Sequence, residues 1–153
     1  MDVPAASTPV ACDMSTATDT PEERLAEYRR LFRQALAGKE RTSEGIRFRF
    51  RAEQGVEPWV RDLAAREKAC CPFFAFAVTA DGDEVLWDAA VIDDDAARAV
   101  LEEFYLLPET AAQSPGELHE RLARRGLRFT TEADGRVATM EAGGRVATTE
   151  AGG

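Results

Sequence analysis

The chain has 153 residues and a mass of 16.7 kDa, which fits one domain of ordinary size with terminal extensions. Its 19 basic and 28 acidic side chains give a net charge of −9. This charge disfavours nucleic acid or an anionic membrane as a partner, because phosphate groups are bound through clustered Lys and Arg. A single histidine, His119, excludes a histidine-rich metal site.

The expected compartment is the cytoplasm. The first residues, Met1-Asp2-Val3-Pro4, lack the basic stretch and apolar run of a secretory signal. The most apolar segment, residues 69–78, is too short and is interrupted by a proline, so it predicts no membrane span. Three cysteines do not form a disulfide framework, and an odd count is more natural where thiols stay reduced.

Both ends of the chain have the composition of tails. Residues 1–19 carry few large apolar side chains, so burial cannot offset the entropy of ordering, and we expect a flexible arm. From residue 131 to 153 a nine-residue unit recurs two and a half times, too few copies for a stacked solenoid. We interpret this segment as a low-complexity tail. Residues 20–130 remain as a single domain.

The elements of this domain have clear boundary signals. Thr20-Pro21-Glu22-Glu23 is a capping box that begins a helix, which Gly38 is expected to end. Strict alternation predicts a strand over residues 46–51, with Arg47, Arg49 and Arg51 on its solvent face, paired with acids such as Glu84 and Asp88 on a neighbouring strand. A helix is expected from Pro58 to Pro72, followed by strands 73–79 and 83–91, which the Asp81-Gly82 turn joins. After these come a helix that Asp93 to Asp95 can cap and that ends before Pro108, a short helix from Ser114 to Gly126 and an edge strand 127–130.

The resulting order is β-α-β-β-α with a leading helix. It predicts an α+β fold with a small, mainly antiparallel sheet and helices on one face. A ferredoxin-like split β-α-β arrangement is the specific topology we expect.

The adjacent pair Cys70-Cys71 is the chemically unusual feature of the sequence. Pro72 follows it, and irregular backbone there would turn both sulfurs to one side, whereas a regular helix would place them about 100° apart. Neighbouring thiols are ligands that soft ions such as Hg(II), Cu(I) or trivalent arsenic prefer. The leading hypothesis is therefore that Cys70 and Cys71 bind and sequester a thiophilic metal or metalloid.

Three nearby or flexible residues extend this site. Glu67 lies on the same helical side and would serve as an oxygen ligand, as a partner of a ligand or as a general base. The positive charge of Lys68 would lower the pKa of Cys70 or Cys71, whereas the partial negative charge at the helix C-terminus would raise it. The sequence does not decide which of the two effects is larger. Cys12, on the arm, has the reach to supply a third sulfur.

Two alternatives stay open beside metal binding. As an enzyme, the chain would be a thiol-dependent reductase or transferase using Cys70, Cys71 and Glu67, although it lacks a Cys-x-x-Cys motif. As a structural or interaction domain, it would simply bury inert cysteines in its core. No signature of a nucleotide cofactor is present, and the sequence does not specify an oligomeric state. The donors for a four-ligand structural zinc within one chain are also missing.

Residues 21–108 resemble a group of small, mostly uncharacterised bacterial proteins. The resemblance rests on a Glu-(Lys/Arg)-x-Cys-Cys-x-Phe motif, here Glu67, Lys68, Cys70, Cys71 and Phe73. Such proteins are often encoded beside mercury- or arsenic-type resistance genes, so the resemblance implies a role accessory to metal resistance with Cys70 and Cys71 as the ligands. This is an association and not a mechanism.

Overall fold

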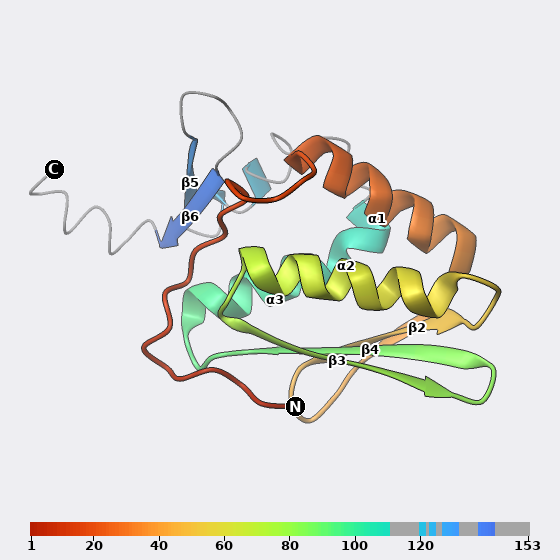
Figure 1. Ribbon diagram of the computed structural model, residues 1–153. Helices are drawn as coiled ribbons and strands as arrows, with labels where there is room; N and C mark the ends of the chain where they lie inside the picture. The colour runs from red at the N-terminus through yellow and green to blue at the C-terminus, as the bar shows by residue number, and fades with distance from the viewer. Residues whose placement is uncertain (111–119, 122, 125–126, 132–137, 143–153) are drawn as a thin grey trace, which may run out of the picture.

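A computed structural model describes residues 1–110, 120–121, 123–124, 127–131 and 138–142 of the protein. The predicted α+β class is confirmed. The described residues form three helices and a four-stranded antiparallel sheet, besides a small two-stranded sheet. Figure 1 shows the helices lying over one face of the larger sheet, with the N-terminal arm running along one side of the domain. The elements in chain order are α1 (Pro21–Ala35), β1 (Leu36–Arg41), β2 (Ile46–Arg51), α2 (Val56–Cys70), β3 (Phe74–Asp81), β4 (Glu84–Val91), α3 (Asp95–Thr110), β5 (Leu127–Thr131) and β6 (Ala138–Ala142).

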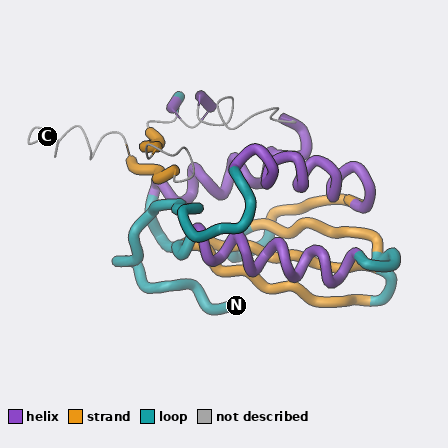
Figure 2. The backbone as a smooth tube through the Cα atoms, turned by 45° about the horizontal axis from the view of Figure 1, so that its top comes forward, coloured by secondary structure: helices purple, strands orange, loops and turns teal. Residues whose placement is uncertain are grey.

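The sheet has the strand order β1-β2-β4-β3, and every neighbouring pair is antiparallel. Strands β2 and β3 therefore run parallel to each other with β4 between them, and α2 connects them. This is the split β-α-β unit that the sequence predicts. The position beside β2, which a final strand occupies in a ferredoxin-like fold, is taken here by β1. Figure 2 shows the helices as one layer on the sheet.

Strand β1 is the element of the main sheet that the sequence analysis missed. The helix that begins at the Thr20 capping box ends at Ala35 and not at Gly38, because Leu36 already has extended backbone angles. The chain then pairs with β2, with a register irregularity between Leu36 and Gly38. The segment contains few residues that favour strands, so its conformation depends on pairing with the strongly patterned β2.

From α3 onward the structure differs from the sequence-based expectations in three respects. Helix α3 continues to Thr110 and contains Pro108, instead of ending before it. The expected edge strand near residues 127–130 forms as β5, but it pairs with β6 in a separate two-stranded sheet. Strand β6 lies within the segment expected to be a repeat tail. Most of the helix expected from Ser114 to Gly126, His119 included, lies outside the described residues.

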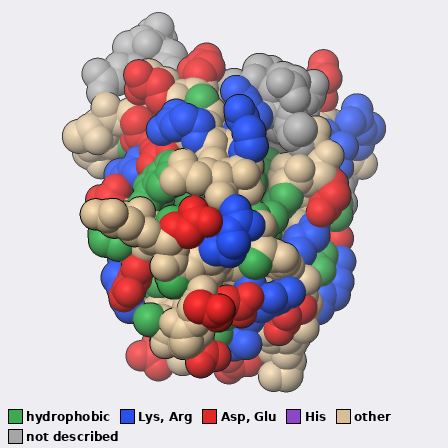
Figure 3. Space-filling model, turned by 90° about the vertical axis from the view of Figure 1, so that its right-hand side faces the viewer, with side chains coloured by type: hydrophobic (Ala, Val, Ile, Leu, Met, Phe, Trp, Pro, Cys, Tyr) green, Lys and Arg blue, Asp and Glu red, His purple; other side chains and the backbone are tan. Residues whose placement is uncertain are grey.

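The core lies between the helices and the covered face of the sheet. The fully buried side chains of β2 and β4, Phe48, Phe50 and Trp87 among them, pack there against α1 and α3. The opposite face carries the arginine stripe, whose predicted acidic partners are confirmed. The Nε atom of Arg47 donates to Asp88 at 2.6 Å, and Arg49 Nη1 donates to Glu84 at 3.0 Å. On the side of the molecule drawn in Figure 3, Lys and Arg are likewise interspersed with Asp and Glu.

Candidate functional site

The candidate site lies at the C-terminal end of α2, where the backbone leaves the helix at Cys71. The Cys71 N–H still donates to Glu67 O at 2.8 Å, but its angles, φ −125° and ψ 77°, are no longer helical. Pro72 cannot continue the helical hydrogen bonding. The carbonyl of Cys70 accepts instead from the N–H of Asp13 on the N-terminal arm, at 2.9 Å. The arm thus caps the end of the helix.

A disulfide joins the arm to this helix end. It links Cys12 to Cys71, which are 59 positions apart in sequence, and their Cα atoms are 4.5 Å apart. Cys71 is 3% exposed, whereas Cys12 is only partly buried. Cys70 is the free cysteine and is 5% exposed. The prediction of three reduced thiols is therefore wrong, because the fold brings the arm directly over the end of α2.

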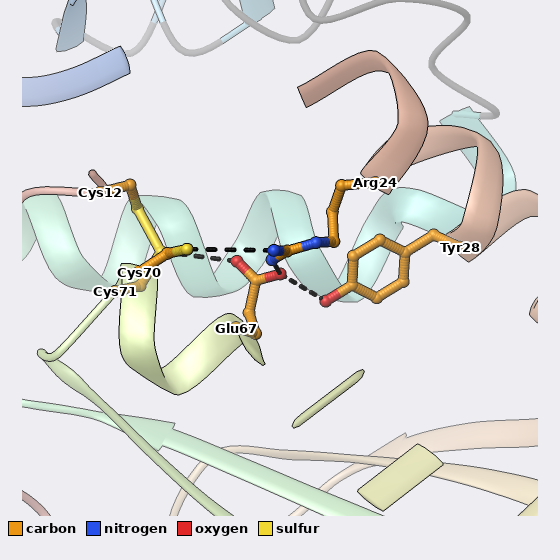
Figure 4. The surroundings of a disulfide bond; sticks show 6 residues. All are labelled: Cys12, Arg24, Tyr28, Glu67, Cys70 and Cys71. Carbon is orange, nitrogen blue, oxygen red and sulfur yellow. Dashed lines mark hydrogen bonds and ion pairs between the residues drawn. A yellow bond between two sulfur atoms is a disulfide. The ribbon is translucent and has the colours of Figure 1, made fainter. Parts of the chain in front are cut away.

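A buried ion pair faces both sulfurs of the Cys70-Cys71 pair (Figure 4). Arg24, which is 5% exposed, places Nη1 3.1 Å from Glu67 Oε1 and Nη2 3.9 Å from the Cys70 sulfur. The hydroxyl of Tyr28 donates to the same Glu67 oxygen at 2.8 Å. The other oxygen, Glu67 Oε2, lies 3.5 Å from the Cys71 sulfur. Glu67 is thus held on one side by two donors and touches the disulfide on the other.

Arg24 is held in place by a second carboxylate. Asp19 accepts from Arg24 Nε at 2.5 Å and from Nη2 at 2.8 Å, a bidentate pair. Burial acts to lower the pKa of Arg24, but Asp19 and Glu67 outweigh it, and the pKa is raised overall. Arg66 also contacts Asp19, at 3.1 Å, and ties this cluster to Glu27 on α1 at 2.7 Å. The residue that positions Glu67 is therefore a permanently charged guanidinium on α1.

The environment disfavours ionisation of the remaining thiol. Burial raises the pKa of Cys70, the nearby Glu67 carboxylate raises it further, and Arg24 only partly opposes these effects. The pKa of Tyr28 is likewise raised, by burial first and by Glu67 second. Cys70 is thus a protonated thiol at neutral pH and a weak nucleophile, because the thiolate is the reactive form.

Lys68 does not take the role that the sequence analysis considered for it. Its ammonium group donates to the main-chain carbonyls of Pro72 at 2.9 Å and Phe74 at 2.7 Å. The cation beside a thiol is Arg24, which lies 46 positions from Cys70 in sequence. Arg24 shares a helical face with Tyr28, so an inward-facing arginine next to a core tyrosine was the available signal. It pointed to a buried ion pair but not to its partner.

The metal-binding hypothesis is wrong. Cys71 shares its sulfur with Cys12 in a disulfide, so Cys70 and Cys71 do not form a pair of thiolate ligands. Within the described part of the chain, no group of three or more His, Cys, Asp or Glu side chains is arranged to hold a metal ion. Glu67 is engaged by Arg24 and Tyr28, and Cys12 supplies a bond to Cys71 instead of a third ligand.

Comparisons with known proteins give no indication of the function, which therefore has to be inferred from the geometry of the site. No protein-family model, no characterised protein and no solved structure matches this chain. The resemblance carried by the Glu67-to-Phe73 motif, with its association with resistance genes, stays a prediction. Among the described residues, none of the helices has the length and apolar content to span a bilayer.

Proposed function

We propose that the protein carries out thiol–disulfide exchange through Cys12 and Cys71, and that its redox state responds to cytoplasmic thiols. The observation that carries the proposal is the disulfide between a partly buried cysteine on the arm and a buried cysteine whose sulfur contacts the Glu67 carboxylate. The two sulfurs differ in access, and a carboxylate lies beside one of them. Exchange chemistry requires both an accessible sulfur and a route for a proton.

Reduction begins at the more accessible sulfur. A thiolate, from a small thiol or a dithiol protein, attacks Cys12 Sγ, the Cys12–Cys71 bond breaks, and its electron pair stays on Cys71. The Cys71 thiolate then takes a proton that solvent supplies through the adjacent Glu67 carboxylate. A second thiol attacks the resulting mixed disulfide and releases Cys12 as a thiol. Two electrons enter the protein and one external disulfide is formed.

Oxidation runs in the opposite direction and uses Glu67. In the dithiol form the Cys71 thiol lies next to Glu67 Oε2, which accepts its proton as the sulfur becomes a thiolate. The thiolate attacks a mixed disulfide formed between Cys12 and an external thiol, and that thiol leaves. Arg24 and Tyr28 keep the acceptor oxygen oriented, because both donate to the other oxygen of the same carboxylate.

The expected compartment favours a reversible Cys12–Cys71 disulfide over a permanent one. The sequence predicts a cytoplasmic protein, and disulfides in that compartment are usually transient, catalytic or redox-sensing, because thiol systems keep cysteines reduced. A bond that closes in such an environment is expected to open and close with the thiol balance.

A second candidate function has its own support. Cys70 and Cys71 are both nearly fully buried, and burial raises the pKa of Cys70. These facts favour a structural or interaction domain in which the disulfide permanently fixes the arm. The two candidates differ in one measurable property, the equilibrium between the disulfide and the dithiol.

The test is a redox titration of the full chain. The protein is equilibrated at neutral pH in dithiothreitol and glutathione redox buffers, free thiols are trapped by alkylation, and the linked fraction is measured by mass spectrometry. Exchange function predicts a midpoint above about −300 mV, whereas structural disulfides usually lie below that value. A lower midpoint would refute exchange in favour of the permanent link.

Two variants locate the chemistry. Glu67→Gln keeps an acceptor for Tyr28 but removes the base, so oxidation of the dithiol should slow and its dependence on pH should change. Cys70→Ser is the matched control, because it changes the neighbouring sulfur and leaves Cys12 and Cys71 intact. If Cys70→Ser slows exchange as much as Glu67→Gln does, Cys70 is a participant and the assignment is wrong.

A further inference from the structure

Strand β3 forms one edge of the four-stranded sheet, with α2 lying over it (Figure 1). Along an antiparallel strand, successive residues turn their N–H and C=O groups alternately toward the neighbouring strand and away from it. The carbonyl of Phe73 accepts from the N–H of Ile92, which follows β4, at 3.2 Å. The odd-numbered residues of β3 therefore face β4, and the even-numbered residues from Phe74 to Ala80 face the free edge.

The first residue on this free edge already has hydrogen-bonding partners. The N–H of Phe74 donates to Cys71 O at 3.1 Å, and Phe74 O accepts from Lys68 Nζ at 2.7 Å. The edge-facing residues of β3 whose backbone groups have no partner in the described part of the chain are Phe76, Val78 and Ala80. Their N–H and C=O groups form an open row, which is a template for pairing with another strand.

The two edges of the sheet differ in how well they are protected. The opposite edge strand, β1, has a register irregularity and ends in Lys39, Glu40 and Arg41. Irregular pairing and charged side chains both discourage the addition of a further strand. From Phe74 to Ala80, β3 carries no charged side chain. The edge formed by β3 is therefore the one that is competent to pair.

A groove flanks the free edge of β3. It lies between α2 and β3, has a volume of about 430 Å³, and is lined in part by Phe76 and Val78. Asp2 of the N-terminal arm also lines it, and the apolar neighbours of Asp2, Met1 and Val3, are 39% and 44% exposed. A strand added to β3 would cover part of this apolar surface, and removing such surface from water favours association.

The open groups match a second copy of the same strand. If two β3 strands pair antiparallel about a two-fold axis at Val78, each Val78 lies opposite the partner's Val78, and Phe76 lies opposite the partner's Ala80. Each such pair exchanges two hydrogen bonds, so every open group of both edges is satisfied. Moving the axis by one residue in either direction leaves groups without partners, because Phe74 is already bonded and β3 ends at Asp81.

This register also brings opposite charges together. Lys68, which donates to the carbonyl of Phe74, then lies beside the partner's turn at residues 81–83, and this turn carries two exposed aspartates. The two-fold axis repeats this contact at the other end of the strand pair. Arg61, the other cation beside the groove, is already paired with Glu57 on the same helix. The ends of the two strands therefore attract each other.

We propose that the free edge of β3 is the interaction surface for a second copy of this chain, and that two chains pair through residues 76–80 to form one continuous sheet. Both α2 helices then lie on the same face of that sheet. An interface built on so short a strand segment is small, so the dimer is weak and depends on concentration. The inference does not rest on thiol exchange, because the edge is open while the Cys12–Cys71 bond is closed.

The test is sedimentation velocity of the oxidised full-length protein from about 5 µM to about 500 µM, the range in which a weak dimer forms. The wild type should shift from monomer to dimer. Ala80→Pro removes an N–H that faces the free edge and keeps the pairing with β4, so it should weaken dimerisation about tenfold or more. Arg41→Pro is the matched control, because its N–H faces outward on the opposite edge, and it should dimerise like the wild type.

Thermal unfolding followed by circular dichroism establishes that each variant folds. If Ala80→Pro does not fold, Ala80→Lys takes its place, because residue 80 is exposed and a charge there would lie opposite the partner's Phe76. A wild type that stays monomeric up to the highest concentration overturns the proposal. A dimer that persists in the Ala80 variant, or that Arg41→Pro abolishes, also overturns it.

Amide hydrogen exchange measured by NMR provides a readout of the edge itself. The amides of Phe76, Val78 and Ala80 should exchange more slowly as the protein concentration rises, whereas the amide of Thr79, which faces β4, should change less. Protection of the three edge amides that is the same at every concentration overturns the proposal, because a segment of the same chain then covers the edge. A dimer whose edge amides stay unprotected overturns it as well, because the contact then lies elsewhere.

Discussion

Removal of the Cys12–Cys71 bond should lower the stability of the protein by an amount set by the chain that it closes. The bond spans 59 positions, and the loop-entropy relation for a loop of that length gives about 4 kcal/mol at 25 °C. The figure applies if the arm stays in place after the bond is lost. The Asp13–Cys70 hydrogen bond and the packing of Val10 and Met14 then hold it.

Release of the arm would make the loss smaller. A free arm regains conformational entropy in the folded protein as well as in the unfolded chain, so the difference between the two states shrinks. A loss near 4 kcal/mol therefore indicates a docked arm, and a clearly smaller loss indicates a released arm. Hydrogen exchange over residues 1–12 distinguishes the two independently.

The assay is urea unfolding of the oxidised wild type, the reduced wild type and Cys12→Ser, with Cys70→Ser as the matched control. Reduction and Cys12→Ser should cause the same loss, and Cys70→Ser should stay within about 1 kcal/mol of the oxidised wild type. For a chain of this size a 4 kcal/mol loss corresponds to a fall in Tm of about 8–16 °C. If the oxidised and reduced proteins unfold at the same urea concentration, the bond does not constrain the chain and the reasoning is refuted.

Three further predictions follow from single residues. Arg24→Met should cost about 3 kcal/mol in urea unfolding, because it leaves the largely buried carboxylates of Asp19 and Glu67 without their cation. Arg98→Met, at an exposed position, should cost less than about 0.5 kcal/mol, and similar costs for both variants would contradict the buried ion pair. In the oxidised native protein Cys70 should react with iodoacetamide more slowly than free cysteine, with a rate still rising above pH 9, because its pKa is raised from the ordinary value of 9.0. The same shift means that the folded state holds this proton more tightly than the unfolded chain, so its contribution to stability is present below pH 9 and is lost as pH rises through the folded pKa. Gly45→Ala should destabilise the fold by about 1–3 kcal/mol in thermal unfolding, because a Cβ at this position would clash with the backbone carbonyl of Ala89 on β4. A Tm equal to that of the wild type would show that the backbone of residue 45 can move away from β4 without a loss of stability.

The sequence predicted the elements whose signals are local. The Thr20 capping box, the alternation of residues 46–51 and the Asp81-Gly82 turn each depend on residues within one or two turns of chain. Their order was enough for the α+β class and for the split β-α-β unit. The segment from Leu36 to Arg41 was missed because its own composition does not favour a strand, and β2 imposes the pairing.

Local sequence signals were sufficient to locate the unusual chemistry at the proline-terminated end of a helix, around Glu67, Cys70 and Cys71. The nature of that chemistry depends on contacts between distant segments of the chain, which the fold establishes. The partner of Cys71 is 59 positions away, and the cation beside Cys70 is on another helix. Residue spacing constrains contacts within one helix or hairpin, but it carries no information about which distant segment closes over a helix end. That contact depends on how the arm and α1 pack against α2, and it converts two adjacent thiols into one disulfide and one buried thiol.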